Sequence, residues 1–356
     1  MSRPINIAFY VHHHGSGHIM RTLAIAKALP HSNITLTGSR LTDYAGIIPP
    51  TYKVINLPMD TPENTDTDFR ASDPDGIHYA PLNIEGQRKR IAMMTDFLAE
   101  TFPLLLVVDV SVEVAMLAAI AGVPFIVVKQ HGNRNDLPHL HAYHNAIGIL
   151  APYPETMKDN DLPWVLKKTF FAGGISRFQS QHDVPIADNK LIAIITGKGG
   201  TSITATLIEH IARSCPEWHF QIMGSLTSST NRQENVTYLG NLENPKSILA
   251  NCAIVIGNAG HNTVMELAAL NKRFIAIPEQ RPFDEQSVKA EILKKLNLAY
   301  VINPERLFEV DWNELFRYNS KQNPDWTSIA SDNAATEAAN YLKQTYYDLF
   351  KNSALL

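Results

Sequence analysis

The residues best suited to chemistry lie in the stretch 254–286, which combines glycines, amides and carboxylates. An apolar run over 253–256 predicts a buried parallel strand, and helical periodicity follows over 263–270. The glycines between them let the backbone approach a ligand closely, and the free N–H groups of the first helical turn can bind an anion. The residues predicted to contact a phosphate group are Gly257, Asn258, Ala259, Gly260, His261, Asn262 and Thr263.

Side chains that can bind hydroxyl groups follow this predicted phosphate site. Glu266 lies on the first turns of the predicted helix, where its carboxylate could accept hydrogen bonds from both hydroxyls of a ribose. A second buried strand is predicted over 274–277, and the loop after it carries Asp284, Glu285 and Gln286. Acidic and amide side chains at the carboxyl end of a strand suit the hydroxyl groups of a sugar.

This arrangement resembles the donor-binding half of GT-B glycosyltransferases, particularly the family 28 C-terminal domain. The matching residues are Gly257, Gly260, Thr263, Glu266, Pro278, Glu285, Gln286 and Ala290. The resemblance implies a nucleoside-diphosphate sugar as donor, with its ribose on Glu266 and its sugar on the acidic-Gln pair. Asn258 departs from the small or basic residue common in the family. The alternative is an ordinary strand-turn-helix crossover in a Rossmann-like sheet.

A second loop with candidate catalytic residues follows the predicted first strand, 5–11, and precedes a predicted helix over 19–29. Its run from Gly15 to Arg21 is similar to the corresponding loop of family 28 and family 1 transferases and of related nucleotide-sugar hydrolases. That resemblance implies that His18 is the general base, because an imidazole titrates near the working pH. His13 and His14 remain rivals, and His18 could instead cap the helix. The residues expected on the acceptor side are His14, Gly15, Gly17, Arg21 and His131.

Asp109 follows a predicted buried strand, 104–108, and so should stand at the same sheet edge as His18. Similarity to family 1 transferases implies that this carboxylate orients the base, and the alternative is an N-cap for the next helix. His131 opens an unusually polar run, 131–144, that also follows a strand and is a candidate acceptor surface.

The predicted second domain opens with a strand over 191–195 and another glycine-rich turn, 196–202. Its N–H groups could hold the diphosphate from the other side, although the spacing is not that of a P-loop. The donor-binding candidates here are Gly197, Gly199, Gly200 and Thr201, with Gly224 added because family members form the base slot after the next strand.

No metal site and no cofactor are predicted. Three consecutive histidines, 12–14, lack a completing Cys or carboxylate at ligand spacing. The acidic triplets 66–68, 73–75 and 159–161 are interpreted as solvated turn residues. The long loop 59–81 could close over an acceptor. A basic stretch, 87–90, on a predicted helix over 84–100 could touch anionic lipid or a diphosphate-linked acceptor, or could simply be a solvated face.

Length and composition indicate two globular domains. The chain has 356 residues, 45% hydrophobic and 19% charged, with a net charge of −4. The basic residues are scattered, so no nucleic-acid partner is expected. We predict a first domain over 1–170, a linker over 171–189, a second domain over 190–327 and a terminal segment over 328–356, whose helix over 328–350 returns to the first domain.

The expected location is cytoplasmic, with peripheral contact at the inner face of the membrane left open. The two cysteines lack CxxC spacing and indicate a reducing compartment or simple core positions, and no apolar run reaches the length of a membrane span or a signal peptide.

The expected fold is α/β, with two Rossmann-like domains facing each other across a cleft in the GT-B manner. The expected function is an inverting, metal-independent glycosyltransferase that moves a sugar from a nucleoside-diphosphate donor, UDP-linked in our prediction, to an acceptor hydroxyl. The acceptor is unknown, and a lipid-linked acceptor is one option. The alternatives are a nucleotide-sugar hydrolase that uses water, a nucleotide-sugar 2-epimerase and a non-catalytic binder of sugar nucleotides. Release of nucleoside diphosphate without acceptor would favour the hydrolase.

Overall fold

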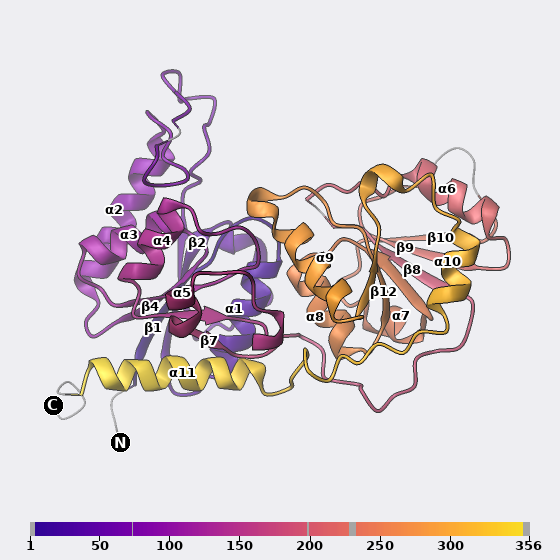
Figure 1. Cartoon of the computed structure of the whole chain (residues 1–356). Coiled ribbons are helices and arrows are strands. Elements are labelled where there is room, and N and C mark those ends of the chain that lie inside the picture. The colour runs from indigo at the N-terminus through magenta and orange to yellow at the C-terminus, as the bar shows by residue number, and fades with distance from the viewer. Residues whose placement is uncertain (1–3, 73, 198, 228–232, 352–356) are drawn as a thin grey trace.

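A computed structural model of the chain describes residues 4–72, 74–197, 199–227 and 233–351, and it contains two parallel β-sheets that lie side by side (Figure 1). The first sheet has the order β3-β2-β1-β4-β5-β6-β7 and the second has the order β10-β9-β8-β11-β12-β13. Two parallel sheets with helices between their strands confirm the α/β prediction.

The first sheet is buried on both faces. Ile7 and Phe9 point to a core shared with α1 and α11, whereas Ala8 and Tyr10 point to a core shared with α2, α3 and α4. The strands are β1 (Asn6–Tyr10), β2 (Asn33–Ser39), β3 (Lys53–Leu57), β4 (Leu105–Asp109), β5 (Phe125–Val128), β6 (Gly148–Ala151) and β7 (Thr169–Phe171). The helices are α1 (Gly17–Lys27), α2 (Glu85–Glu100), α3 (Val112–Ile120), α4 (Leu137–Asn145) and α5 (Pro163–Lys168), with short 3-10 turns η1 (Leu41–Tyr44) and η2 (Glu155–Met157).

The second sheet is covered in the same way, by α7, α8 and α9 on one face and by α6 and α10 on the other. Its strands are β8 (Leu191–Ile195), β9 (His219–Met223), β10 (Val236–Gly240), β11 (Ile254–Gly257), β12 (Arg273–Ala276) and β13 (Ala299–Val301). Its helices are α6 (Ala205–Ser214), α7 (Lys246–Asn251), α8 (His261–Ala269), α9 (Glu285–Lys295) and α10 (Trp312–Asn319), with 3-10 turns η3 (Pro282–Asp284) and η4 (Pro304–Arg306). Both cysteines are buried in these cores.

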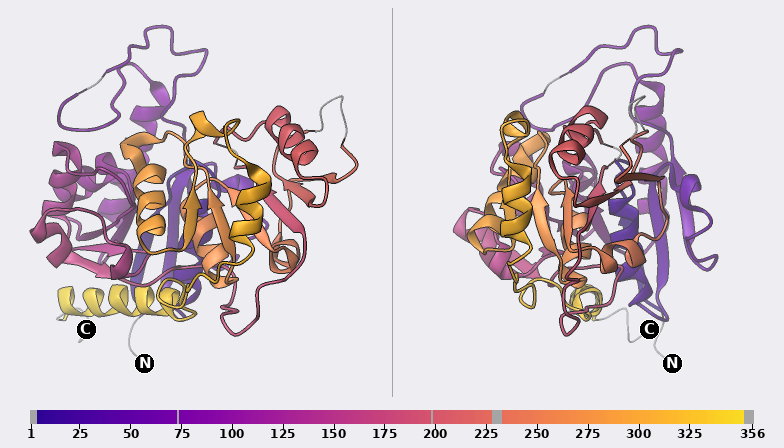
Figure 2. Two further views of the ribbon diagram at one scale, coloured as in Figure 1. Left: turned by 45° about the vertical axis from the view of Figure 1, so that its right-hand side comes forward. Right: turned by 90° about the vertical axis from the view of Figure 1, so that its right-hand side faces the viewer.

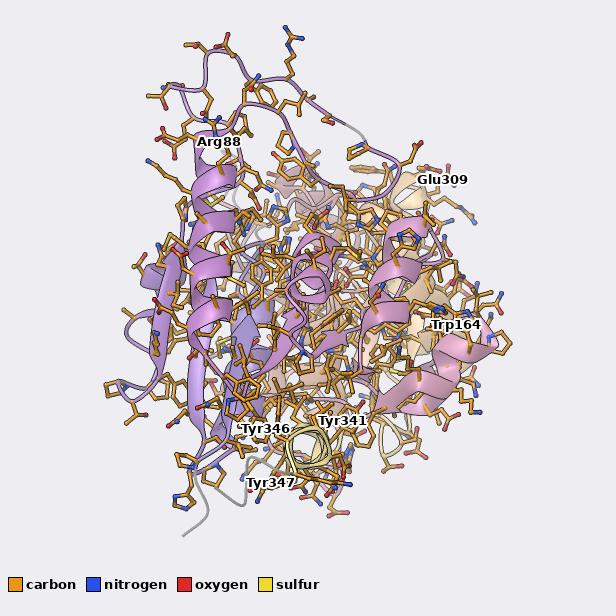
Figure 3. The ribbon with its side chains drawn as sticks, turned by 90° about the vertical axis from the view of Figure 1, so that its left-hand side faces the viewer. Arg88, Trp164, Glu309, Tyr341, Tyr346 and Tyr347 are labelled. Carbon is orange, nitrogen blue, oxygen red and sulfur yellow. The ribbon has the colours of Figure 1, made fainter. Side chains whose placement is uncertain are left out.

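The last helix, α11 (Ala334–Leu349), packs beneath the first sheet and against α1. Figure 3 views α11 along its axis, with Tyr341 and Tyr346 on the side that faces the sheet. The helix begins later than the predicted residue 328, because Gly174 N donates to Ile329 O at 2.9 Å and holds the preceding segment in a bridge.

Arg90 does not lie on a solvated basic face, contrary to the sequence-based expectation. Its side chain shares the buried face of α2 with Met94. Arg90 Nη1 lies 2.6 Å from Asp60 Oδ2, and Nη2 donates to the Tyr10 hydroxyl at 2.6 Å. Arg88 is exposed and points outward near the start of the helix (Figure 3).

The third acidic triplet is also not solvated. Asp159 and Asp161 are each 8% exposed and flank the buried ammonium of Lys129 at 2.8 and 3.0 Å. Their burial was missed because the partner lies 30 residues away in the chain. In the first triplet, Asp66 accepts hydrogen bonds from the Glu63 and Glu85 backbones, as a turn residue should. Residue 73 of the second triplet lies outside the described residues.

We expect K129M to destabilise the protein strongly, because it leaves two buried carboxylates without their cation. Breaking a buried ion pair from one side costs roughly 3 kcal/mol or more. Urea unfolding followed by circular dichroism measures this loss. K158M, which removes the exposed lysine next to Asp159, is the matched control and should change little. Equal stability of K129M and the native protein would contradict the assigned role.

Within the described residues, the helices all fall short of the length and apolarity that crossing a membrane requires. A loop whose described residues are 58–72 and 74–84 rises above the first sheet, and Figure 2 shows it from two further directions.

Candidate active site

A group of three side chains, the buried Arg21 and Asp109 and the partly exposed His18, lies at the carboxyl edge of the first sheet. β1 and β4 are neighbours, so the loop leading into α1 lies beside the end of β4. His18 Nδ1 is 2.8 Å from Asp109 Oδ2, and Arg21 Nη2 donates to both Asp109 oxygens at 2.6 and 2.8 Å. The alternative that Asp109 caps the next helix is wrong, because Ser111 accepts the capping hydrogen bond from Val114 N.

The charges in this group determine which ring nitrogen of His18 carries the proton. Burial opposes ionisation of Asp109, but Arg21 and His18 outweigh it and hold the pKa of that carboxyl well below its usual value. An ionised carboxylate can only accept, so Nδ1 of His18 carries a proton and donates it to Asp109. Nε2 of the neutral ring then keeps the lone pair that a general base needs.

The backbone that follows Asp109 is strained. Val110 has a φ of 57°, a left-handed conformation that β-branched residues rarely adopt. Such conformations cost on the order of 1–3 kcal/mol and persist where the surrounding structure enforces them. Here the turn places Asp109 beside α1 while Ser111 caps α3.

The other histidines of this loop have different surroundings. His12 stacks on His13 with ring centroids 4.9 Å apart, and burial, with the neighbouring histidines, lowers its pKa to about 3. His13 Nε2 lies 3.8 Å from Asp60 Oδ1, which is too far for a hydrogen bond, and His14 is exposed. In the described chain, a carboxylate at hydrogen-bonding distance therefore distinguishes His18 from its three neighbours.

The predicted phosphate turn faces the His18 loop across the domain interface. The first N–H groups of α8, like those of any α-helix, have no intrahelical partner, and its N-cap Gly260 has no side chain to cap them. Asn262 Nδ2 donates to Gly17 O at 3.4 Å and so joins the two loops. Gly15, with a φ of 77°, turns the exposed end of the His18 loop into α1.

The side chains of this turn are less accessible than we expected. His261 is 6% exposed, Asn258 is 8% exposed and Ala259 is fully buried. His261 can therefore offer a ligand its backbone N–H but not its ring. Thr263 keeps intermediate exposure on the first turn of the helix.

The predicted ribose carboxylate already has a partner. Glu266 Oε1 is 2.8 Å from Arg177 Nε, and Arg177 Nη1 also donates to Glu243 O at 2.9 Å. Burial raises the pKa of Glu266, and Arg177 opposes that shift. A pocket between α1 and α8 is lined by Met20, Arg21, Ala24, Ile175, Ser176, Arg177, Asn262 and Glu266. Glu266 therefore lines the same pocket as Arg21 of the first domain.

The second glycine-rich turn holds a carboxylate of the chain itself. Ser202 donates to Glu279 from its N–H at 2.5 Å and from its hydroxyl at 2.8 Å, and Asn258 Nδ2 donates at 2.9 Å. A phosphate group can reach the Ser202 amide only if Glu279 moves. Helix α6 begins at Ala205, after this turn, and its N-cap Thr204 accepts a hydrogen bond from Leu207 N.

The glycines of this second turn are bounded by Arg281. Arg281 Nη2 donates to Gly200 O at 2.7 Å, and a Cβ on Gly199 would lie 3.3 Å from the same nitrogen. A Cβ on Gly197 would meet open space, whereas Lys198 lies outside the described residues. Thr201 Oγ1 accepts a hydrogen bond from Ile203 N. Gly224 has a φ of 126° and packs directly on Thr196, so it has a structural reason to be glycine.

The predicted sugar-binding loop lies against the first domain. Asp284 Oδ2 accepts from Asn133 Nδ2 at 2.7 Å, and Asn133 N donates to Phe283 O at 2.7 Å. Phe283 and Asp284 have φ values of 61° and 55°, a second strained turn at the domain interface. Gln286 Oε1 accepts from Glu279 N at 2.9 Å. Glu285 pairs with Lys289 at 3.2 Å.

The prediction of an acceptor surface at His131 is not supported by its burial. Its ring is fully buried, stacks near Tyr153 with centroids 3.9 Å apart, and places Nε2 3.0 Å from Met157 O. Arg134 and His139 of the polar run 131–144 are also buried, whereas its exposed polar residues are Asn133, Asn135, His141 and His144.

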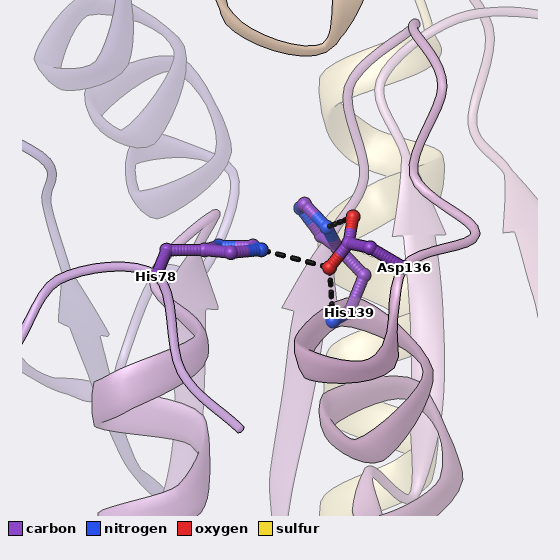
Figure 4. A group of neighbouring side chains, drawn as sticks. All are labelled: His78, Asp136 and His139. Carbon is purple, nitrogen blue, oxygen red and sulfur yellow. Dashed lines mark hydrogen bonds and ion pairs between the residues drawn. The ribbon is translucent and has the colours of Figure 1, made fainter. Parts of the chain in front are cut away.

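His78, Asp136 and His139 form the one group in the described residues that has the ligand types of a metal site (Figure 4). Asp136 Oδ1 is 2.8 Å from His78 Nε2, and Oδ2 is 2.6 Å from His139 Nδ1. Arg134 Nη1 lies 2.9 Å from His139 Nε2, which must therefore accept. The ring proton then sits on Nδ1 and is donated to Asp136. This pattern indicates a hydrogen-bonded cluster, and not a metal site. The cluster attaches His78 of the 58–84 loop to the start of α4.

The sequence did not point to three charged residues of the site, which are Arg177, Glu279 and Lys289. Glu279 directly follows Pro278 at the end of β12, and this position could have flagged it as a strand-end carboxylate. Lys289 lies one helical turn after Glu285, a spacing that predicts an ion pair. Arg177 lies in the segment between the sheets, where no motif marked it.

Comparison with known proteins bears on both halves of the chain. Residues 205–339 match the glycosyltransferase family 28 C-terminal domain. The chain is similar to the UDP-N-acetylglucosamine--N-acetylmuramyl-(pentapeptide) pyrophosphoryl-undecaprenol N-acetylglucosamine transferases of two bacteria. For Thermosipho africanus the identity is 26%, over 38% of this chain and 45% of the relative. For Oceanobacillus iheyensis it is 27%, over 56% of this chain and 59% of the relative.

The chain thus spans about half the length of the curated relatives that it matches. Among solved structures, MurG of Acinetobacter baumannii superposes with a TM-score of 0.64 at 14% identity, covering 95% of this chain and 99% of that one. This similarity extends over both sheets and confirms the predicted fold. The chain has the GT-B fold, and its second half matches the C-terminal domain of glycosyltransferase family 28.

Proposed function

We propose that the protein is an inverting, metal-independent glycosyltransferase that transfers a sugar from a UDP-linked donor to an acceptor hydroxyl. The observation that carries this proposal is the position of the His18–Asp109 pair directly across from the N-terminus of α8, with Asn262 bonded to Gly17 between them. The match to the family 28 domain supports a nucleotide-sugar donor, and the UDP-N-acetylglucosamine donor named for the two bacterial relatives supports UDP.

The chemistry proposed follows from this geometry. Nε2 of His18 takes the proton of the acceptor hydroxyl as its oxygen attacks the anomeric carbon, and Asp109 stabilises the imidazolium that forms. The free N–H groups of α8 stabilise the charge that develops on the leaving diphosphate, which is a task that a divalent ion performs elsewhere. Attack opposite the leaving group inverts the anomeric configuration.

The acceptor that we propose is lipid-linked, with peripheral membrane contact by the cytoplasmic enzyme. The support is the pyrophosphoryl-undecaprenol acceptor in the names of the relatives and the exposed Arg88 and Lys89 on α2 beside the 58–84 loop.

The test begins with a thermal-shift panel of UDP-, dTDP-, GDP- and ADP-linked sugars. The donor that stabilises the protein most is then incubated with and without candidate acceptor, and release of nucleoside diphosphate is followed. Transfer predicts release that depends on the acceptor. Equally fast release in water alone would assign hydrolysis instead.

We expect E266Q to weaken binding of UDP by about 10-fold or more, because a charged acceptor for ribose hydroxyls is lost. Titration calorimetry with UDP and with 2′-deoxy-UDP measures this, and the preference of the native protein for UDP should shrink in the variant. E291Q, an exposed glutamate on α9, is the matched control. An unchanged preference would remove the ribose role from Glu266.

A further inference from the structure

Lys289 is a fully buried lysine beside the predicted sugar-binding loop. It lies on α9, one turn after Glu285, and its side chain is 0% exposed. Burying an ammonium group is costly unless the group is paired and hydrogen-bonded. A lysine at this position therefore calls for a specific reason.

The contacts of Lys289 join two loops of the proposed donor site. Its Nζ donates to Glu285 Oε1 at 3.2 Å and to Ala259 O at 3.4 Å. Glu285 begins α9 after the sugar-binding loop, whereas Ala259 belongs to the turn that precedes α8. The ammonium thus lies between the loop of the predicted sugar contact and the turn of the predicted phosphate contact.

The pairing also controls the charge on Glu285. Burial raises the pKa of this carboxyl, but the ammonium of Lys289 and the guanidinium of Arg134 outweigh burial and lower it. Burial lowers the pKa of Lys289 in turn, and Glu285 and Asp159 oppose that shift while Arg21 adds to it. The rings of His131 and His261 also face Lys289, and burial lowers the pKa of both.

Glu285 remains accessible although its partner is not. Its side chain is 21% exposed, and its backbone packs against Gly132 of the first domain. Gly132 has a φ of 119°, and a side chain there would collide with Phe283 O. The backbone of Glu285 is therefore fixed against the first domain, while its carboxylate pairs with Lys289 and stays partly exposed to solvent.

We infer that Lys289 is a positioning residue that holds Glu285 ionised and in place to accept hydrogen bonds from the hydroxyls of the donor sugar. This inference rests on the proposed function. It adds to that function a carboxylate, Glu285, that binds the sugar of the donor and not its nucleotide. Lys289 itself touches neither substrate.

The test compares K289M with K294M, an exposed lysine of the same helix. The probes are the best-binding nucleotide sugar of the panel above and its free nucleoside diphosphate, both titrated by calorimetry. K289M should bind the nucleotide sugar about 10- to 100-fold more weakly, since a hydrogen bond to a charged group is lost, and bind the nucleoside diphosphate about as well as the native protein. K294M should match the native protein with both probes.

The pH dependence separates positioning from a merely structural role. In the native protein Glu285 is ionised across the neutral range, because its pKa lies below the usual value. In K289M, burial without the neighbouring ammonium raises that pKa, so the carboxyl takes up a proton as the pH falls. Binding of the nucleotide sugar by K289M should therefore weaken further between about pH 8 and about pH 6, whereas the native affinity should stay flat.

A double variant guards against misfolding of K289M. E285Q/K289M buries no unpaired charge, and it should bind the nucleotide sugar about as weakly as E285Q alone, with no pH dependence. Equal losses for sugar nucleotide and free nucleotide in K289M, or additive losses in the double variant, would overturn the inference and leave the proposed function standing. Failure of the native protein to bind any probe would overturn both.

Discussion

H18A should lower kcat by about 10²- to 10⁴-fold, the usual contribution of a positioned general base, while the affinity for the donor stays nearly constant. The reason is that His18 lies on the first domain, whereas the proposed donor contacts lie on α8 and in the loop before α9. Initial rates with the donor selected by thermal shift, together with calorimetric titration of that donor, measure the two quantities separately.

H14A is the matched control for this experiment, because His14 is exposed on the same loop and contacts the His12 ring edge-on. It should retain most of the activity. Full activity in H18A, or an equal loss in H14A, would take the role of the base away from His18.

D109N should lower kcat by about 10²- to 10⁴-fold without a matching change in KM, because the wrong tautomer of His18 would be favoured. An amide can offer its NH₂ group to Nδ1, which then accepts and leaves the proton on Nε2, where the base needs a lone pair. The imidazolium would also lose the carboxylate that now lies 2.8 Å away.

Steady-state kinetics across pH, with a melting curve for each variant, would check this. The melting curve matters because Arg21 also depends on Asp109. D96N, an exposed aspartate on α2, is the control. A rise in KM at constant kcat would show that Asp109 acts on binding and not on the base.

The pairing of His18 with Asp109 could be predicted because strand order places it. In a parallel sheet that carries β1 next to β4, the residues after these strands must meet at one edge. The glycine-rich turn before α8 could be predicted for a similar reason, since an apolar run, a break and a helical period occur in sequence. These features depend on local pattern and on topology.

The charged contacts inside the site could not be predicted in the same way. Arg177 meets Glu266 across 89 residues, and Ser202 meets Glu279 across 77. Contacts between residues so far apart leave no periodic pattern in the sequence. The sequence also does not distinguish a charged residue that is buried from one that is exposed. Arg90 shows the same difficulty within a helix, because its place on the buried face depends on where α2 begins.

The most direct test of glycosyl transfer follows the sugar itself. A donor that carries a radiolabelled sugar, chosen from the thermal-shift panel, is incubated with an extract of bacterial membrane lipids, and the label is located after separation. The account predicts that the native protein moves the label to a lipid with inverted anomeric configuration and that H18A does not. Label released to water at the same rate with and without the extract would contradict glycosyl transfer.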